Sequence, residues 1–205
     1  MNIIFATGNK DKLVEVKEIL STINKDVTVS SMKEVGLDPE IVEDGLTFEE
    51  NAMIKAREVY KAAKEKNMED ILVLADDSGL CIDCLNGEPG IFSARYLGRD
   101  TTYEEKNKNL IERVNATGDK DRAARFVCAV AAVFPDGREK VVTGKIEGTV
   151  AFAPSGNKGF GYDPIFYVPS LGCTTADIPC EQKNSISHRG NALRLMKEEL
   201  LKEKL

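Results

Sequence analysis

Residues 2–20 read NIIFATGNKDKLVEVKEIL, and this segment decides the fold. Its first part, residues 2–7, is an apolar run typical of a strand that is buried on both faces. The turn signal TGNK follows at residues 7–10, and Asn9 is a suitable N-cap for a helix. With another strand predicted at residues 27–29, the order strand, turn, helix, strand favours an α/β fold. The helix would bury apolar side chains at helical spacing: Leu13, Val16, Ile19 and Leu20.

The rest of the chain continues this alternation of helices and strands. Two capping boxes, Thr47 with Glu50 and Thr102 with Glu105, predict helix starts. With no internal repeat or linker, residues 1–205 are predicted to form a single α/β unit with mixed strands, and two lobes with a cleft between them are compatible with it. The predicted elements are a helix over 47–66, a strand over 71–75, a strand over 79–85, a helix over 102–114, a hairpin of 125–134 and 139–146, a glycine-rich loop over 154–161, and a last helix from about 187 with Ala192, Leu193, Met196 and Leu200 inward.

Composition and charge exclude several classes of protein. The 205 residues are 42% hydrophobic and 30% charged, close to globular averages, which excludes a collagen-like or disordered chain. The net charge of −6 argues against a protein that grips nucleic acid with a basic surface. The longest apolar run, residues 127–134, is too short to span a membrane. Residues 1–5 have neither a basic region nor a long apolar run, so we expect no secretory signal. Five cysteines, including a C-x-x-C at Cys81 and Cys84 that we interpret as buried thiols, indicate a reduced, cytoplasmic protein.

The turn at residues 7–12 is the first candidate site. Backbone amides at a helix N-terminus carry partial positive charge and bind phosphate, and Lys12 lies in the first helical turn. The spacing matches neither a P-loop nor a dinucleotide-binding turn. A capped turn with solvated lysines explains the same residues without a ligand.

Two neighbouring carboxylates, Asp76 and Asp77, follow the strand predicted at residues 71–75. Ligands in open α/β sheets collect beyond the carboxyl ends of strands. Successive strand side chains point to opposite faces, so we expect one of the pair to face the ligand. Carboxylates that also face phosphates suit Mg²⁺, and Glu43 with Asp44 offers a second acidic cluster. The alternative interpretation is a simple Asp-Ser turn that ends the strand.

Two late segments, residues 159–164 and 183–190, form the third candidate site. The glycines on both sides of Phe160 let the backbone approach a ligand, and its ring can stack on a base. The single histidine, His188, lies beside Arg189 at a predicted helix start. Cations there oppose the helix dipole, which favours an anionic or carbonyl-rich ligand over a solvated helix end.

Several sequence blocks occur in one order along the chain: FATGN at 5–9 with Lys12, EDGLTFEENA at 43–52, KAR at 55–57, ADDSGL at 75–80, PGIFSARY at 89–96, GFGYDPIF at 159–166 and ISHRG at 186–190. Together they resemble the inosine triphosphate pyrophosphatase family over nearly the whole chain. The resemblance implies hydrolysis of non-standard purine nucleoside triphosphates (ITP, dITP and XTP) to the monophosphate and pyrophosphate, with Mg²⁺. It also implies an elongated mixed-sheet protein with two lobes around a central active-site cleft, assembled as a homodimer.

The family's site residues are carried over position by position. The resemblance implies that Asp77 is the general base and a metal ligand, that Glu43 shares the metal, and that Ser78 contacts the substrate. His188 or Arg189 would donate to the 6-carbonyl of hypoxanthine or xanthine, which adenine lacks. A Maf-like pyrophosphatase with another base preference and a non-catalytic nucleotide-binding regulator are the alternatives. The implied phosphate contacts are Thr7, Gly8, Asn9, Lys10, Asp11, Lys12 and Lys55, and the implied nucleotide contacts are Phe160, Gly161, Tyr162, Asp163, Lys183, His188 and Arg189.

Overall fold

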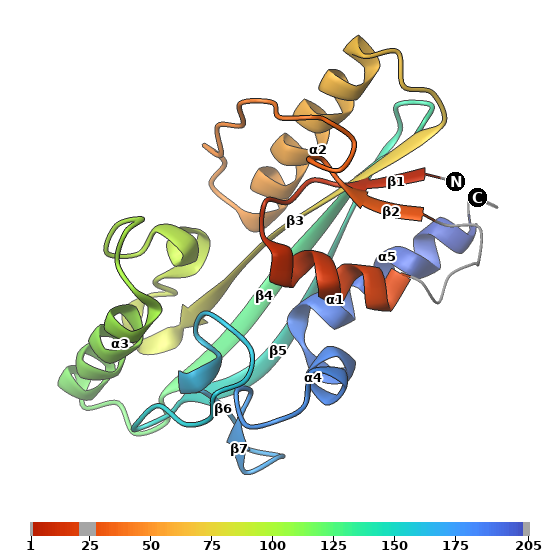
Figure 1. Ribbon diagram of the computed structural model, residues 1–205. Coiled ribbons are helices and arrows are strands. Elements are labelled where there is room, and N and C mark those ends of the chain that lie inside the picture. The colour runs from red at the N-terminus through yellow and green to blue at the C-terminus, as the bar shows by residue number, and fades with distance from the viewer. Residues whose placement is uncertain (1, 21–27, 203–205) are drawn as a thin grey trace. The chain divides into compact units, whose positions relative to one another are not determined.

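A computed structural model describes residues 2–20 and 28–202 (Figure 1), except for the side chains of Lys10 and Asp11. Among these residues the strands form one seven-stranded sheet in the order β2-β1-β3-β4-β5-β6-β7. β1 pairs in parallel with β2 and β3, whereas β6 is antiparallel to β5 and β7, so the predicted mixed α/β sheet is confirmed. The elements are β1 (Asn2–Phe5), α1 (Lys10–Leu20), β2 (Thr28–Ser31), α2 (Phe48–Glu65), β3 (Ile71–Ile82), η1 (Asp83–Leu85), η2 (Gly90–Arg95), α3 (Tyr103–Thr117), β4 (Ala123–Val133), β5 (Glu139–Val150), η3 (Asp163–Ile165), β6 (Phe166–Val168), β7 (Cys173–Thr174), α4 (Cys180–Ile186) and α5 (His188–Lys202).

The chain divides into two compact units. Unit 1 comprises Met1–Asp77, Cys128–Gly144 and Arg189–Leu205, and unit 2 comprises Ser78–Val127 and Lys145–His188. The division falls within β3, β4 and β5, so each of these strands contributes residues to both units. The elongated outline and the central cleft expected from the resemblance stay predictions.

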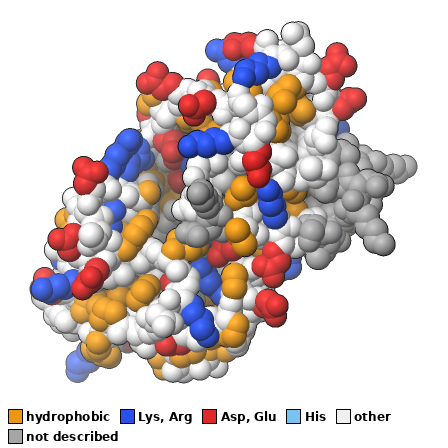
Figure 2. All heavy atoms as spheres, viewed as in Figure 1, with side chains coloured by type: hydrophobic (Ala, Val, Ile, Leu, Met, Phe, Trp, Pro, Cys, Tyr) orange, Lys and Arg blue, Asp and Glu red, His pale blue; other side chains and the backbone are white. Residues whose placement is uncertain are grey.

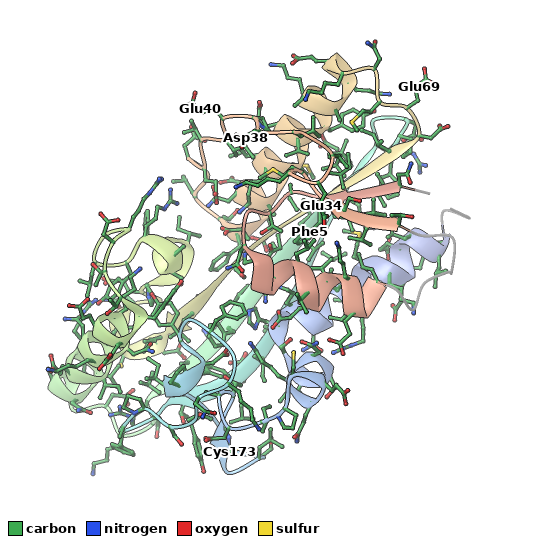
Figure 3. All side chains as sticks on the ribbon, in the orientation of Figure 1. Phe5, Glu34, Asp38, Glu40, Glu69 and Cys173 are labelled. Carbon is green, nitrogen blue, oxygen red and sulfur yellow. The ribbon has the colours of Figure 1, made fainter. Side chains whose placement is uncertain are left out.

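The core of unit 1 forms where α1 and α5 bury their apolar faces with β1 and β3. Phe5 on β1 is fully buried and points into this core (Figure 3). The inward residues predicted for the first helix, Val16 and Leu20, are fully buried, while Leu13 and Ile19 pack at the edge of the cluster. The predicted inward face of the last helix is also confirmed, because its four apolar residues are all buried: Ala192, Leu193, Met196 and Leu200.

The core of unit 2 lies between α3 and the continuation of β3. Leu110 and Val114 on α3 are fully buried with Leu80 and Ile82 on β3. The hairpin predicted at the Pro-Asp-Gly turn is confirmed, since the Phe134 amide donates to the Arg138 carbonyl at 2.9 Å. In the described part of the chain, no helix has the length and apolar character needed to cross a membrane. Acidic and basic side chains are interspersed over the visible face (Figure 2).

The prediction that a strand ends at residue 75 is wrong. β3 continues through the Asp-Asp-Ser-Gly segment to Ile82, so neither an Asp-Ser turn nor a separate strand over residues 79–85 exists. A 3₁₀ turn, Asp83–Leu85, follows instead. Turn-forming residues stay in the strand here because distant cations neutralise Asp76, as described below, and the sheet satisfies the backbone.

Helix ends agree with the predicted caps, with two differences. The capping box of Thr102 and Glu105 is complete, but α3 runs on to a left-handed Gly118 (φ 71°). Thr47 caps α2 as predicted, whereas the Glu50 carboxylate accepts from the Leu46 amide at 2.6 Å instead of completing the capping box.

Two other elements differ from the prediction. The helix α4 was not predicted. The strand predicted at residues 27–29 is found at Thr28–Ser31, and Val27 lies outside the described residues.

Candidate active site

The turn between β1 and α1 presents helix-start amides beside open space. The Asn9 amide donates to the Thr7 hydroxyl at 3.1 Å, and the Lys12 amide donates to Asn9 Oδ1 at 3.2 Å, which confirms Asn9 as the N-cap. A Cβ built at Gly8 would have no heavy atom within 4 Å. The turn therefore has open space beside Gly8 at the start of α1, and the side chains of Lys10 and Asp11 lie outside the described part of the structure.

Asp76 lies on the interior side of β3 and is a buried electrostatic centre of unit 1. Its carboxylate accepts from Lys12 Nζ at 2.9 and 3.1 Å and from Arg189 Nε at 3.3 Å. Arg189 Nη1 also donates to Glu15. Burial alone would raise the pKa of Asp76, but the charges of Lys12, Arg189 and Lys55 outweigh it and hold that pKa well below its ordinary value.

Asp77, the next residue, has different partners. Lys55 Nζ lies 3.4 Å from its Oδ1, and Asn51 Nδ2 donates to its Oδ2 at 3.3 Å. Its side chain is 12% exposed, against 1% for Asp76, and the expectation that one of the pair faces the ligand stays a prediction. Burial raises the pKa of Asp77, and Lys55 only partly opposes this shift. A carboxylate in this state is a stronger base than a solvated aspartate.

Asn51 connects Asp77 with the acidic loop before α2. Its side chain is fully buried, and its Oδ1 accepts from the Gly45 amide at 2.9 Å. A Cβ at Gly45 would lie 2.7 Å from Glu50 Cβ and 2.8 Å from Asn51 Oδ1. Only glycine therefore fits where the loop backbone comes this close to the first turn of α2. The same loop carries Glu43, whose carboxylate accepts from Lys55 Nζ at 2.9 Å.

The two predicted metal ligands, Glu43 and Asp77, both contact Lys55 Nζ. Their carboxylates therefore converge on one positive charge, and burial of Lys55 is outweighed by these anions, which raise its pKa. Within residues 2–20 and 28–202, no group of three or more His, Cys, Asp or Glu side chains is arranged to hold a metal ion. Two carboxylates without a full protein cage fit Mg²⁺, which takes its other ligands from water and substrate phosphates.

In unit 2, Asp163 organises the segment that carries Phe160. Its Oδ2 accepts from the Phe160 amide at 2.8 Å and from Lys183 Nζ at 2.7 Å, and its Oδ1 accepts from the Thr175 hydroxyl at 2.8 Å. Lys183 Nζ also lies 4.6 Å from the centroid of the Phe160 ring. A Cβ at Gly159 (φ 72°) would overlap the Asp163 carboxylate, so glycine is required there.

The other predicted nucleotide contacts lie in well-packed surroundings. His188 is 6% exposed and stacks on Phe126, with ring centroids 4.6 Å apart and an interplanar angle of 12°. Tyr162 is buried and donates from its hydroxyl to the Ser93 carbonyl at 2.6 Å, so this side chain supports the segment. Ser78 is half-buried on β3 as the first residue of unit 2.

Comparison with known proteins agrees with this arrangement of residues. The model of the Ham1 family matches residues 3–199. The chain belongs to the Ham1 family. It is 45% identical to a dITP/XTP pyrophosphatase of Clostridium perfringens, over 96% of both chains. A solved HAM1 protein of Coxiella burnetii superimposes with a TM-score of 0.86 at 40% identity, covering 98% of this chain and 99% of that one, and the Staphylococcus aureus Ham1 protein does so with a TM-score of 0.83 at 41% identity, covering 99% and 100%.

In this Ham1 chain, unit 1 brings together four predicted residues: Lys12, Glu43, Lys55 and Asp77. Unit 2 brings together Phe160, Asp163 and Lys183. Arg189 is 2% exposed, and its guanidinium pairs with Asp76 and Glu15 in unit 1, so its predicted contact with the base stays a prediction.

Several supporting residues were not predicted as parts of the site. Each has a buried polar or aromatic side chain that forms a hydrogen bond to a predicted site residue or stacks on one. Asn51 carries a signal that was available, because it lies next to the apolar stripe of its helix, where a polar residue needs a buried partner. The residues missed in this way are Glu15, Asn51, Phe126 and Thr175.

Proposed function

We propose that this chain hydrolyses the non-standard purine nucleoside triphosphates ITP, dITP and XTP to the monophosphate and pyrophosphate. The observation that carries the proposal is the division between two neighbouring carboxylates on β3. Asp76 pairs with Lys12, and the turn leaves open space beside Gly8, while Asp77 keeps a raised pKa among Asn51, Lys55 and Glu43. The name of the Clostridium perfringens relative, dITP/XTP pyrophosphatase, supports the same reaction.

The phosphates bind to residues of unit 1. The α1 amides that follow Asn9 donate to phosphate oxygens, and Gly8 leaves the space for them. Lys12 and Lys55 are partly exposed ammonium groups that balance the charge of the triphosphate. Both are held by carboxylates, so they are ordered before the substrate arrives.

Hydrolysis begins with Asp77. Its carboxylate accepts a proton from a water molecule, whose oxygen attacks the α-phosphorus. The bond from the α-phosphorus to the oxygen that bridges to the β-phosphorus breaks, and that oxygen leaves as part of pyrophosphate. Asn51 donates to Oδ2 of Asp77, and the other oxygen of this carboxylate, Oδ1, lies 3.4 Å from Lys55 Nζ.

Glu43 and Asp77 would hold Mg²⁺, because their carboxylates already converge on a single cation, Lys55 Nζ. When bound, Mg²⁺ neutralises phosphate charge and stabilises the departing pyrophosphate.

Selection of the base belongs to unit 2. The half-buried Phe160 offers a ring for stacking, and the Asp163–Lys183 pair fixes its position. We propose His188 as the first donor to the 6-carbonyl of the base, because the guanidinium of Arg189 pairs with Asp76 and Glu15. Adenine presents an amino group at that position and leaves the donor unpaired. The kcat/KM for ATP should therefore be lower than that for ITP by up to roughly 10⁴-fold. From the resemblance we also propose a cytoplasmic homodimer.

A substrate panel tests the proposal. With Mg²⁺, ITP, dITP and XTP should each release one pyrophosphate per monophosphate, while ATP and GTP release little. Inorganic phosphate as the first product would mean that another phosphorus is attacked. A preference for other modified bases would favour a Maf-like enzyme, and ITP binding by calorimetry without turnover would favour a regulator.

A further inference from the structure

The segment that carries Phe160 is held by a side chain outside the proposed substrate contacts. Asn107 lies on α3, is 4% exposed, and donates from Nδ2 to the Gly161 carbonyl at 3.1 Å. Gly161 directly follows Phe160 and has a left-handed backbone (φ 68°). The amide of Asn107 is therefore bonded to the residue next to the stacking ring.

The other polar atom of the Asn107 side chain, Oδ1, adds nothing to the stability of the protein. Asn107 Oδ1 is buried and has no hydrogen-bond partner among the described residues. The amide orientation is set by its partner, because the Gly161 carbonyl can only accept. Burying an unpaired acceptor lowers stability, and an apolar side chain of similar size would avoid that cost. What this asparagine provides is thus the bond from Nδ2 to Gly161.

The neighbouring residue Tyr162 is anchored in the same region. Its hydroxyl donates to the Ser93 carbonyl at 2.6 Å, and its ring meets the edge of Tyr103, with centroids 5.3 Å apart. Lys106, the residue before Asn107, is 1% exposed and donates to the Ala94 carbonyl at 2.9 Å. α3 and η2 therefore form a buried polar support under Gly161 and Tyr162, and Asn107 is the side chain bonded to the Gly161 backbone.

We propose that Asn107 is a positioning residue for the nucleoside part of the substrate. By holding the Gly161 carbonyl, it fixes the backbone on the C-terminal side of Phe160, while Asp163 fixes the Phe160 amide. The ring is thereby ordered before it stacks on a base, and the ordering entropy is not lost on binding. This inference rests on the proposed function for the identity of the ligand.

The test compares Asn107→Leu and Asn107→Ala with Asn109→Ala. Asn109 is a matched control because it lies on the same helix and also makes one side-chain hydrogen bond, accepting from the Tyr96 hydroxyl at 2.7 Å. Calorimetry measures the Kd of each variant for inosine monophosphate and for pyrophosphate, and ITP kinetics and thermal unfolding accompany it. Loss of one positioning hydrogen bond should weaken binding of inosine monophosphate by roughly fivefold in both Asn107 variants.

Pyrophosphate affinity and kcat should stay near wild type in these variants while the KM for ITP rises, and Asn107→Leu should unfold near the wild-type temperature. Asn109→Ala should bind inosine monophosphate like the wild type. Equal losses for inosine monophosphate and pyrophosphate, or no loss in Asn107→Leu, would overturn the positioning role. A wild-type protein that neither turns over ITP nor binds inosine monophosphate would instead overturn the proposed function together with this inference.

Discussion

Asp76→Asn removes a buried negative charge that Lys12 and Arg189 share. Breaking a buried ion pair by removing one partner typically costs about 3–5 kcal/mol. Here the Lys12 side chain is 18% exposed and can turn to water, and Arg189 keeps Glu15, so we expect the lower end, about 3 kcal/mol. For a chain of this size, that corresponds to a fall of roughly 6–12 °C in the unfolding midpoint.

Asp77→Asn is the matched control, since it is the same substitution one residue further along β3. Burial raises the pKa of Asp77, so the ionised carboxylate is disfavoured in the folded protein, and an amide removes that penalty. We expect equal or greater stability, with ITP turnover reduced by about two orders of magnitude or more. Asp76→Asn should also weaken pyrophosphate binding, because Lys12 loses its anchor.

The pH dependence separates the two residues further. Asp76 has a lowered pKa, so its contribution is present above its ordinary value of 3.8 and is lost as pH falls below that value. The stability gap between wild type and Asp76→Asn should therefore narrow from about pH 5 to about pH 3. Asp77 has a raised pKa, so its penalty grows as pH rises above 3.8. Thermal unfolding of the wild type, Asp76→Asn and Asp77→Asn across this pH range measures how far the stability of each variant differs from that of the wild type. An Asp76→Asn protein as stable as the wild type at neutral pH would refute the reasoning.

Three further predictions follow from single features of the site. Gly8→Val fills open space without a clash, so the protein should unfold at the wild-type temperature while its KM for ITP rises, which steady-state kinetics measures. Gly159→Ala places a Cβ on the Asp163 carboxylate in a left-handed backbone, and calorimetric unfolding should show a loss of about 1–3 kcal/mol; an unchanged midpoint would contradict this. Chelation should abolish pyrophosphate release, and added Mg²⁺ should restore it; activity that persists in chelator would remove Glu43 from a metal site.

Much of the fold could be predicted from the sequence because the residues that become buried follow a regular spacing within each helix and strand. Apolar residues at helical spacing indicate which face of each helix is buried, as for Val16 and Leu20 and for Ala192 and Met196. The capping residue Asn9 likewise identified the start of α1. These signals need no knowledge of other parts of the chain.

The extent of β3 was not predictable in this way. Asp-Asp-Ser-Gly has turn propensity, and the reason that it stays in a strand lies far along the chain. Asp76 is neutralised by Lys12 and Arg189, which are 64 and 113 residues away. A single sequence shows these cations but not their partners, so the pairing of Arg189 with Asp76 was not predicted. Asn107 was missed because a buried asparagine resembles a surface one until its acceptor is known, whereas the place of Asn51 beside the apolar stripe of its helix was a signal that could have been used.

The two aspartates show how a strand separates stability from reactivity. Side chains of successive strand residues point to opposite sides, so one backbone position can hold a fixed charge while the next holds a reactive one. Lys12 and Arg189 hold the pKa of Asp76 well below its ordinary value, so it is a poor base, whereas Asp77 is held by a neutral amide and by an ammonium at 3.4 Å. Had both carboxylates faced one side, their repulsion would have forced one of them to take up a proton. Alternation along β3 thus lets a lysine be anchored for phosphate beside a carboxylate that remains free to accept a proton from water.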